Sequence, residues 1–136
     1  MRLLLSLGYF VLFSKLLGAN LYSQRRQYEL MKVINVDHTV SFQNAHGVDA
    51  KKIYETPETQ VIHMALSPGQ ALKRHTTPID VFFYILEGKG MVEIGEETQE
   101  VEKDMVIDSP KGISHMLQNT GESMFRFLVV KLLRTA

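Results

Sequence analysis

The chain has 136 residues, of which 45% are hydrophobic and 22% are charged, and 15 Lys and Arg balance 15 Asp and Glu. This length supports one domain with its own core, but not two. The zero net charge leaves no basic surplus, so we expect no nucleic-acid partner. The chain has no cysteine, which excludes disulfides, a thiolate metal site and a cysteine nucleophile.

The first 30 residues differ in character from the rest of the chain. "MRLLLSLGYFVLFSK" has the basic start and apolar middle of a signal peptide, although Leu17 stands where a cleavage site needs a small residue. The run is short and interrupted for a membrane span, so an anchor is a second interpretation. A third is that translation starts at Met31, as "MKVINVDH" favours. We therefore divide the chain into an extension, 1–30, and a domain, 31–136. We expect a cytoplasmic protein, or a membrane-anchored or exported one if the extension is real and retained.

From Met31 onward, short apolar and β-branched runs alternate with turns such as "SPGQ", "EGKG", "SPKG" and "NTGE". No amphipathic helix of useful length interrupts them. Many short strands at regular spacing predict an antiparallel sandwich or barrel. The predicted strands are 33–36, 39–42, 60–66, 81–86, 91–95, 98–101, 105–108, 113–118 and 124–133.

The run "VFFYIL" at 81–86 is apolar on both faces of its predicted strand. Side chains alternate along a strand, so Val81, Phe83 and Ile85 share one face, and Phe82, Tyr84 and Leu86 share the other. Because neither face is polar, we expect both to be buried. The cover is a second sheet of the same chain or a second subunit, and we expect a homodimer.

Two of the five histidines share a context. His75 and His115 each follow a Gly/Pro turn at the mouth of a strand, in "PGQALKRH" and "SPKGISH". Neutral imidazole is a good ligand for transition metals. His63 lies mid-strand and either faces into the barrel or is a buried histidine bonded to the backbone. His46 belongs to a barrel mouth or the surface, and His38 to a turn.

The spacing around these two histidines resembles that of the cupin family. Gly69 is followed by five residues and then His75, as in the first cupin motif. "PKGISHMLQN" carries the proline, glycine, histidine and asparagine of the second motif, while its first glycine falls on Asp104. The likeness covers residues 69–119 directly. It implies an all-β fold, the cupin-type antiparallel β-barrel or jelly roll.

The resemblance also implies a metal site, which this sequence carries only in part. A complete cupin site of this type uses two histidines and a glutamate from the first motif and one histidine from the second. Here the second histidine position holds Thr77 and the glutamate position holds Val81. His75 and His115 remain, with His63 the better candidate for a third ligand and Asp80 a weaker one. The pair would hold a divalent metal such as Mn, Fe, Ni, Zn or Cu.

Two functions follow from the resemblance. The first is a metal-dependent cupin enzyme, such as an oxygenase, isomerase or decarboxylase, acting on a small molecule at a weak or incomplete metal site. The alternative is a metal-free module that binds a small ligand without catalysis. The residues expected to line the ligand pocket are Thr77, Asp80, Val81, Phe83 and Ile85.

Overall fold

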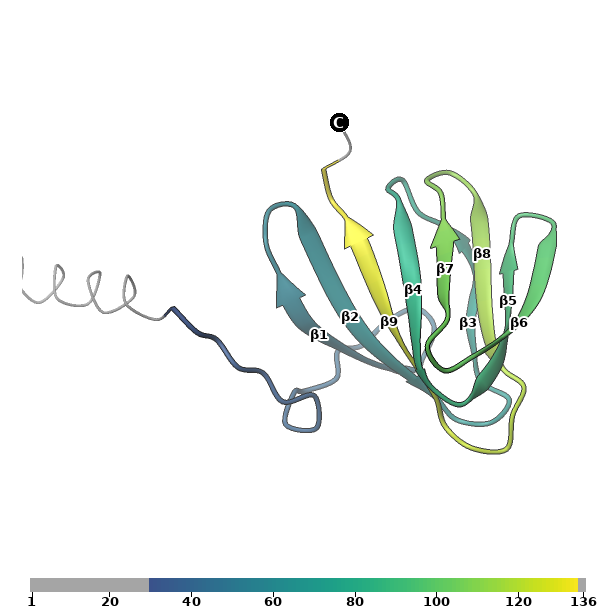
Figure 1. Ribbon diagram of the computed structural model, residues 1–136, viewed down its shortest axis with the longest axis horizontal. Helices are drawn as coiled ribbons and strands as arrows, with labels where there is room; N and C mark the ends of the chain where they lie inside the picture. The colour runs from purple at the N-terminus through teal and green to yellow at the C-terminus, as the bar shows by residue number, and fades with distance from the viewer. Residues whose placement is uncertain (1–29, 135–136) are drawn as a thin grey trace, which may run out of the picture. The chain divides into compact units, whose positions relative to one another are not determined.

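The computed structural model describes residues 30–134 as nine strands, with no helix in that range (Figure 1). The signal-peptide, anchor and start-site interpretations concern residues 1–29, which lie outside the described residues. Within residues 30–134, no helix is long and apolar enough to cross a membrane. The strands are β1 (Asp49–Glu55), β2 (Thr59–Leu66), β3 (Ala71–Thr76), β4 (Val81–Glu87), β5 (Lys89–Ile94), β6 (Glu97–Glu102), β7 (Val106–Ser109), β8 (Ser114–Asn119) and β9 (Phe125–Leu132).

The nine strands form two antiparallel sheets, which confirms the predicted all-β jelly roll. One sheet has the order β1-β2-β9-β4-β7 and the other has the order β3-β8-β5-β6 (Figure 1). Both sheets contribute apolar side chains to one core. Phe83, Phe125, Phe127, Ile85 and Leu117 are fully buried in it. Burial of such side chains is the main favourable term in folding.

The predicted strands at 33–36 and 39–42 are wrong. Residues 30–48 form turns and extended chain without strand pairing. The Asn35 side chain accepts a hydrogen bond from the backbone of Asp37 at 2.8 Å, and the Asn35 carbonyl accepts one from His38 at 3.2 Å. An asparagine that bonds the backbone two residues on favours a turn over a strand. His38 therefore lies in a turn, as the sequence predicts.

Strand β4 has one buried and one half-buried face. Val81, Phe83 and Ile85 are at most 1% exposed, which confirms the burial expected of that face. Phe82 and Tyr84 are half-buried on the other face. This chain therefore covers the face of Phe82 and Tyr84 only in part. The homodimer expected to cover the rest stays a prediction.

Turn residues and motif residues both serve the backbone of the fold. Gly88 has a φ of +82°, and a Cβ there would collide with the Met124 carbonyl oxygen, so only glycine fits. Asp104, where the second motif has a glycine, has a φ of +67°. Aspartate is among the few residues that tolerate this left-handed conformation. Asn119 is buried and donates to the carbonyls of Leu66 and Ser123, both at 2.8 Å.

Candidate functional site

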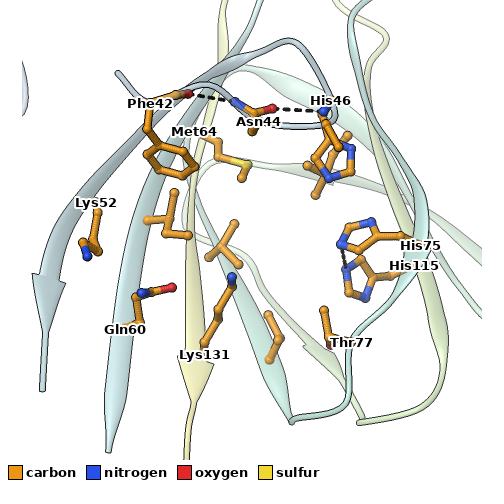
Figure 2. Close-up of a pocket in the computed structure, with 15 residues that line it drawn as sticks. Phe42, Asn44, His46, Lys52, Gln60, Met64, His75, Thr77, His115 and Lys131 are labelled. Carbon is orange, nitrogen blue, oxygen red and sulfur yellow. Dashed lines mark hydrogen bonds between the residues drawn. The ribbon is translucent and has the colours of Figure 1, made fainter. Parts of the chain in front are cut away.

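The two motif histidines face each other across neighbouring strands. His75 on β3 is the cross-strand partner of His115 on β8, and their Nε2 atoms lie 3.2 Å apart. The β3 register shifts between Leu72 and His75. Without that bulge, side chains three residues apart would point to opposite faces. The bulge therefore lets His75 share the inner face with Leu72, which lines the same pocket (Figure 2).

Hydrogen bonds at the two Nδ1 atoms set the tautomers of this pair. His75 Nδ1 lies 2.8 Å from the Lys73 carbonyl, which only accepts, so Nδ1 carries the hydrogen and Nε2 the lone pair. His115 Nε2–H then donates to that lone pair. His115 Nδ1 accepts from the Ser109 hydroxyl at 2.9 Å. In the neutral pair the Nε2 donor and the Nε2 acceptor satisfy each other, so a ligand that binds them must replace their hydrogen bond.

A third histidine, His46, lines the pocket beside the pair. The His46 ring lies 4.7 Å from the His75 ring, centroid to centroid. His46 Nδ1 accepts a hydrogen bond from the backbone N–H of Lys73 at 3.0 Å. In the neutral ring this leaves a hydrogen on His46 Nε2. Lys73, at the β3 bulge, thus orients both rings: its N–H binds His46 and its carbonyl binds His75.

The pair opens on a pocket of about 440 Å³ between the two sheets (Figure 2). Apolar side chains, among them Ile62, Met64 and Val129, form much of the lining. His115 and His75 stand on one side, and the Lys131 amine points in from β9 on another. A largely apolar cavity with a few convergent polar groups is the usual form of a small-molecule site.

The environment favours neutral imidazoles. Burial, together with the neighbouring His75 and His46, lowers the pKa of His115 to about 4. Burial, with His75 and Lys73 nearby, also lowers the pKa of His46. His115, which is 1% exposed, is therefore neutral at pH 7. A neutral ring can accept a proton or donate a lone pair, and it lies edge-on to Phe83.

The structure brings some of the predicted pocket residues to the site and not others. Thr77 and Val81 line the pocket. Phe83 and Ile85 lie deeper, fully buried in the core. Asp80 does not line the pocket, because its carboxylate accepts a hydrogen bond from the Lys111 backbone at 2.9 Å.

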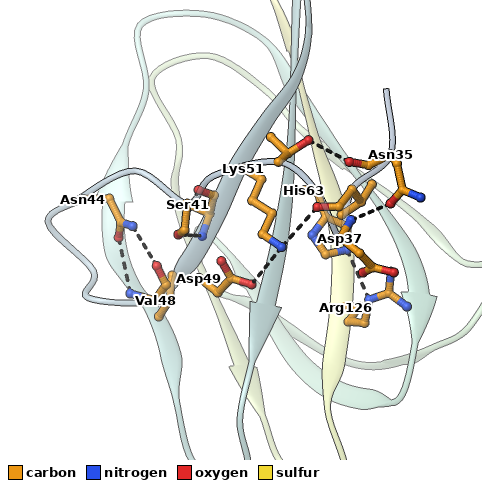
Figure 3. A network of polar contacts seen from close by, with 12 residues as sticks. Asn35, Asp37, Ser41, Asn44, Val48, Asp49, Lys51, His63 and Arg126 are labelled. Atoms are coloured by element: carbon orange, nitrogen blue, oxygen red, sulfur yellow. Dashed lines mark hydrogen bonds and ion pairs between the residues drawn. The ribbon is translucent and has the colours of Figure 1, made fainter. Parts of the chain in front are cut away.

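His63 lies on the outer face of β2, away from the pocket, so the structure does not bring it to the His75–His115 pair (Figure 3). Its Nε2 accepts from Arg126 Nε at 3.1 Å, and its Nδ1 has no hydrogen-bond partner among the described residues. Burial, followed by the charge of Arg126, lowers the pKa of His63. Strand alternation explains the placement, because the neighbours Ile62 and Met64 face the pocket.

Sequence reasoning missed Ser109 and Lys131. Lys131 continues the inward series of Phe125, Phe127 and Val129 on β9, so a charged residue on an apolar face was the available signal. Ser109 ends β7 and is fully buried. No local signal marks it, because its contact with His115 depends on pairing between distant strands.

The residues present fit a metal ion only in part. Two nitrogens that ligate one zinc ion at about 2.0–2.1 Å with tetrahedral angles lie about 3.3 Å apart, close to the spacing of this pair. His115 would need its hydrogen on Nδ1, donated to Ser109, as metal-ligating histidines commonly arrange it. His46 offers a hydrogen rather than a lone pair. Within residues 30–134, no group of three or more His, Asp or Glu side chains is placed to hold a metal. The donor set therefore falls short of a complete metal site.

Comparison with known proteins identifies the family. A sequence model of the Cupin domain matches residues 62–131, which include both histidines of the pair. The chain belongs to the cupin family. The solved structure of a protein from Thermus thermophilus is 27% identical, with a TM-score of 0.66, and the match covers 77% of this chain and 100% of that one.

Two further similar proteins have names that refer to polyketides. The tetracenomycin polyketide synthase protein TcmJ of Streptomyces glaucescens is 30% identical over 60 residues, 43% of this chain. The match spans only 40% of that protein's length. The polyketide cyclase RemF of Streptomyces resistomycificus is 22% identical with a TM-score of 0.67, over 77% of this chain and 81% of that one. The RemF likeness shows the fold alone.

Proposed function

We propose that this cupin binds a small organic molecule in the barrel pocket, with the His75–His115 pair as its main polar recognition group. The observation that carries the proposal is the pair itself, which places a mutually bonded donor and acceptor in the wall of an otherwise largely apolar cavity of about 440 Å³. Sites of this kind use apolar walls for affinity and a few placed polar groups for orientation.

The hydrogen bonds behind the pair support this role. Both Nδ1 atoms are already engaged, by the Lys73 carbonyl and by Ser109, so the rings are held. A ligand would engage the Nε2 atoms by replacing the hydrogen bond between them. Polar groups that are fixed before binding lose little entropy when the ligand arrives. The partial likeness to the tetracenomycin polyketide synthase protein TcmJ is compatible with a small organic ligand.

A screen of aromatic fragments by ligand-observed NMR with the full chain tests the proposal. We expect several fragments to bind the wild type and to lose binding in Val129→Phe, which fills the pocket from β9. Leu128→Phe is the matched control, because Leu128 is the adjacent residue on the outer face of the same strand. A screen without ligands, or ligands unaffected by Val129→Phe, would overturn the proposal.

A divalent ion held by the same pair is the second candidate, favoured by the 3.2 Å spacing of the two nitrogens and the neutral state of His115. His75 and His115 would hold the ion and would supply two of the three or four protein ligands found in stable sites. A bound ion of this kind could polarise a ligand oxygen. We expect such binding to be weak.

Metal analysis of the purified full chain, after incubation with Mn, Fe, Ni, Zn or Cu and gel filtration, separates the two candidates. Our proposal expects less than one equivalent of any metal to be retained. One equivalent retained by the wild type and by His63→Leu, but lost in His75→Ala, would replace the metal-free proposal with the metal site.

A further inference from the structure

We infer that the ligand of this pocket is an organic anion with an apolar body, and that Lys131 is its counter-ion. The inference rests on the proposed function and adds the charge and chemical class of the ligand. It begins with the charge of the pocket. Two lysines and three histidines line it, and none of its lining residues is Asp or Glu (Figure 2).

The two lysines differ in how their charge is balanced. Lys52 lies 2.6 Å from Glu55, which does not line the pocket, and this hydrogen bond lowers the pKa of Glu55. For Lys131, no carboxylate lies within 4 Å of the ammonium group among residues 30–134. The arginines at 74, 126 and 134 each have an acidic partner in the same range.

Lys131 holds its charge beside apolar side chains rather than in open solvent. It is half-buried and follows the inward residues Phe127 and Val129 on β9. A cation held against apolar surface loses part of its hydration, and an opposite charge nearby offsets that loss. Since the lining contains no acid, an anionic ligand is the group that would supply this charge inside the pocket.

The histidine side of the pocket offers a hydrogen-bond donor. The backbone N–H of Lys73 bonds His46 Nδ1 and so leaves a hydrogen on His46 Nε2. Ile62, Met64 and Val129 form apolar wall in the same pocket. A donor and a cation around an apolar cavity favour a carboxylate or similar anion on an apolar body.

Titration of the full chain with 2-naphthoate and with 2-naphthamide, its neutral analogue of nearly the same shape, tests the inference by fluorescence or calorimetry. We expect naphthoate to bind about tenfold more tightly than naphthamide at low salt, a preference equivalent to one modest charge interaction. Lys131→Met should abolish that preference by weakening naphthoate binding more than naphthamide binding. Lys131→Arg should retain it. Lys52→Met is the matched control and should retain it too.

The outcomes separate this inference from the proposed function. Equal binding of the two probes would overturn the anion inference while leaving small-molecule binding intact. A naphthoate preference that survives Lys131→Met would overturn the role of Lys131. Binding of neither probe at millimolar concentration would overturn the anion inference and count against the proposed function. Thermal unfolding of each variant shows whether an affinity loss comes from unfolding.

Discussion

The pocket between the sheets and the outer face of the five-stranded sheet both contain buried histidine, but they use it differently. At the pocket, the Nδ1 atoms of His75 and His115 are hydrogen-bonded to Lys73 and Ser109. Their Nε2 atoms are hydrogen-bonded to each other beside the cavity. On the outer face, His63 is 3% exposed and accepts from Arg126. Figure 3 shows that outer region with Lys51, which donates to the Val36 carbonyl at 3.1 Å and ties the chain before β1 to the sheet.

The two regions differ in charge as well as in space. The outer network mixes both signs, with Arg126 paired to Glu87 and Lys51 near Asp49. The pocket lining holds cations and histidines without an acid. Balanced charges with internal partners suit a structural contact, whereas an unbalanced set beside a cavity suits a ligand. The neighbouring positions Ile62 and His63 of one strand thus serve different purposes.

The largest effect on stability should come from truncating Phe83, the buried ring that packs against His115. Phe83→Ala should destabilise the protein by about 3–5 kcal/mol, because a fully buried phenylalanine leaves a cavity. Phe82→Ala, on the half-buried outer face of the same strand, should cost about 1 kcal/mol. Urea unfolding measures both. Equal costs would contradict the difference between the inner and outer faces.

Acid should weaken the fold through the pocket histidines more than through the outer one. The pKa of His115 is about 4 in the folded chain and near 6.5 when unfolded, so the unfolded chain binds the proton first. Its contribution is fully present above pH 6.5 and is lost as the pH falls to about 4, by about 3 kcal/mol. Burial lowers the pKa of His63 as well, and its contribution has the same sign.

Urea unfolding between pH 7 and pH 4 checks this expectation. His115→Gln should flatten the pH dependence of the free energy of unfolding more than His63→Gln does. The opposite order would show that the outer histidine carries the larger penalty.

Replacing His115 or His63 by leucine should change the stability of the protein by different amounts. His115→Leu should cost about 1–3 kcal/mol, because the buried Ser109 hydroxyl loses its partner. His63→Leu should change stability by less than about 1 kcal/mol, since it removes a buried N–H without a partner as well as an acceptor for Arg126. Thermal unfolding measures both changes. Loss of fragment binding in His63→Leu would argue that the outer histidine acts on the pocket.

The smallest effect is expected on the outer side, at Asp104. Asp104→Gly relieves a φ of +67° but removes the acceptor of the Tyr84 hydroxyl at 2.9 Å. The two terms oppose each other, so we expect a change within about 1 kcal/mol. Asp104→Val should be clearly destabilising by comparison, because a β-branched residue fits this conformation poorly. Chemical denaturation of the two variants tests the contrast.

Much of the fold could be predicted from local pattern. Turn residues and alternating apolar runs marked the strands from β4 onward, and the proline, glycine and histidine spacing marked the second motif. The strands β1 and β3 were not predicted, because "DAKKIYE" and "ALKRHT" are polar and half-exposed at sheet edges. The segments at 33–36 and 39–42 look like strands by composition, but the Asn35 turn takes over the backbone there.

The sequence by itself determined the all-β cupin fold and singled out His75 and His115. Only the tertiary structure decided which other groups join them. It turned His63 outward, brought Ser109 behind His115 and placed His46 and Lys131 at the pocket. The physical reason is that local composition sets the strands and turns, whereas the face of a side chain depends on register. In β3 a single bulge set the face of His75, and that bulge exists only in the pairing with β8.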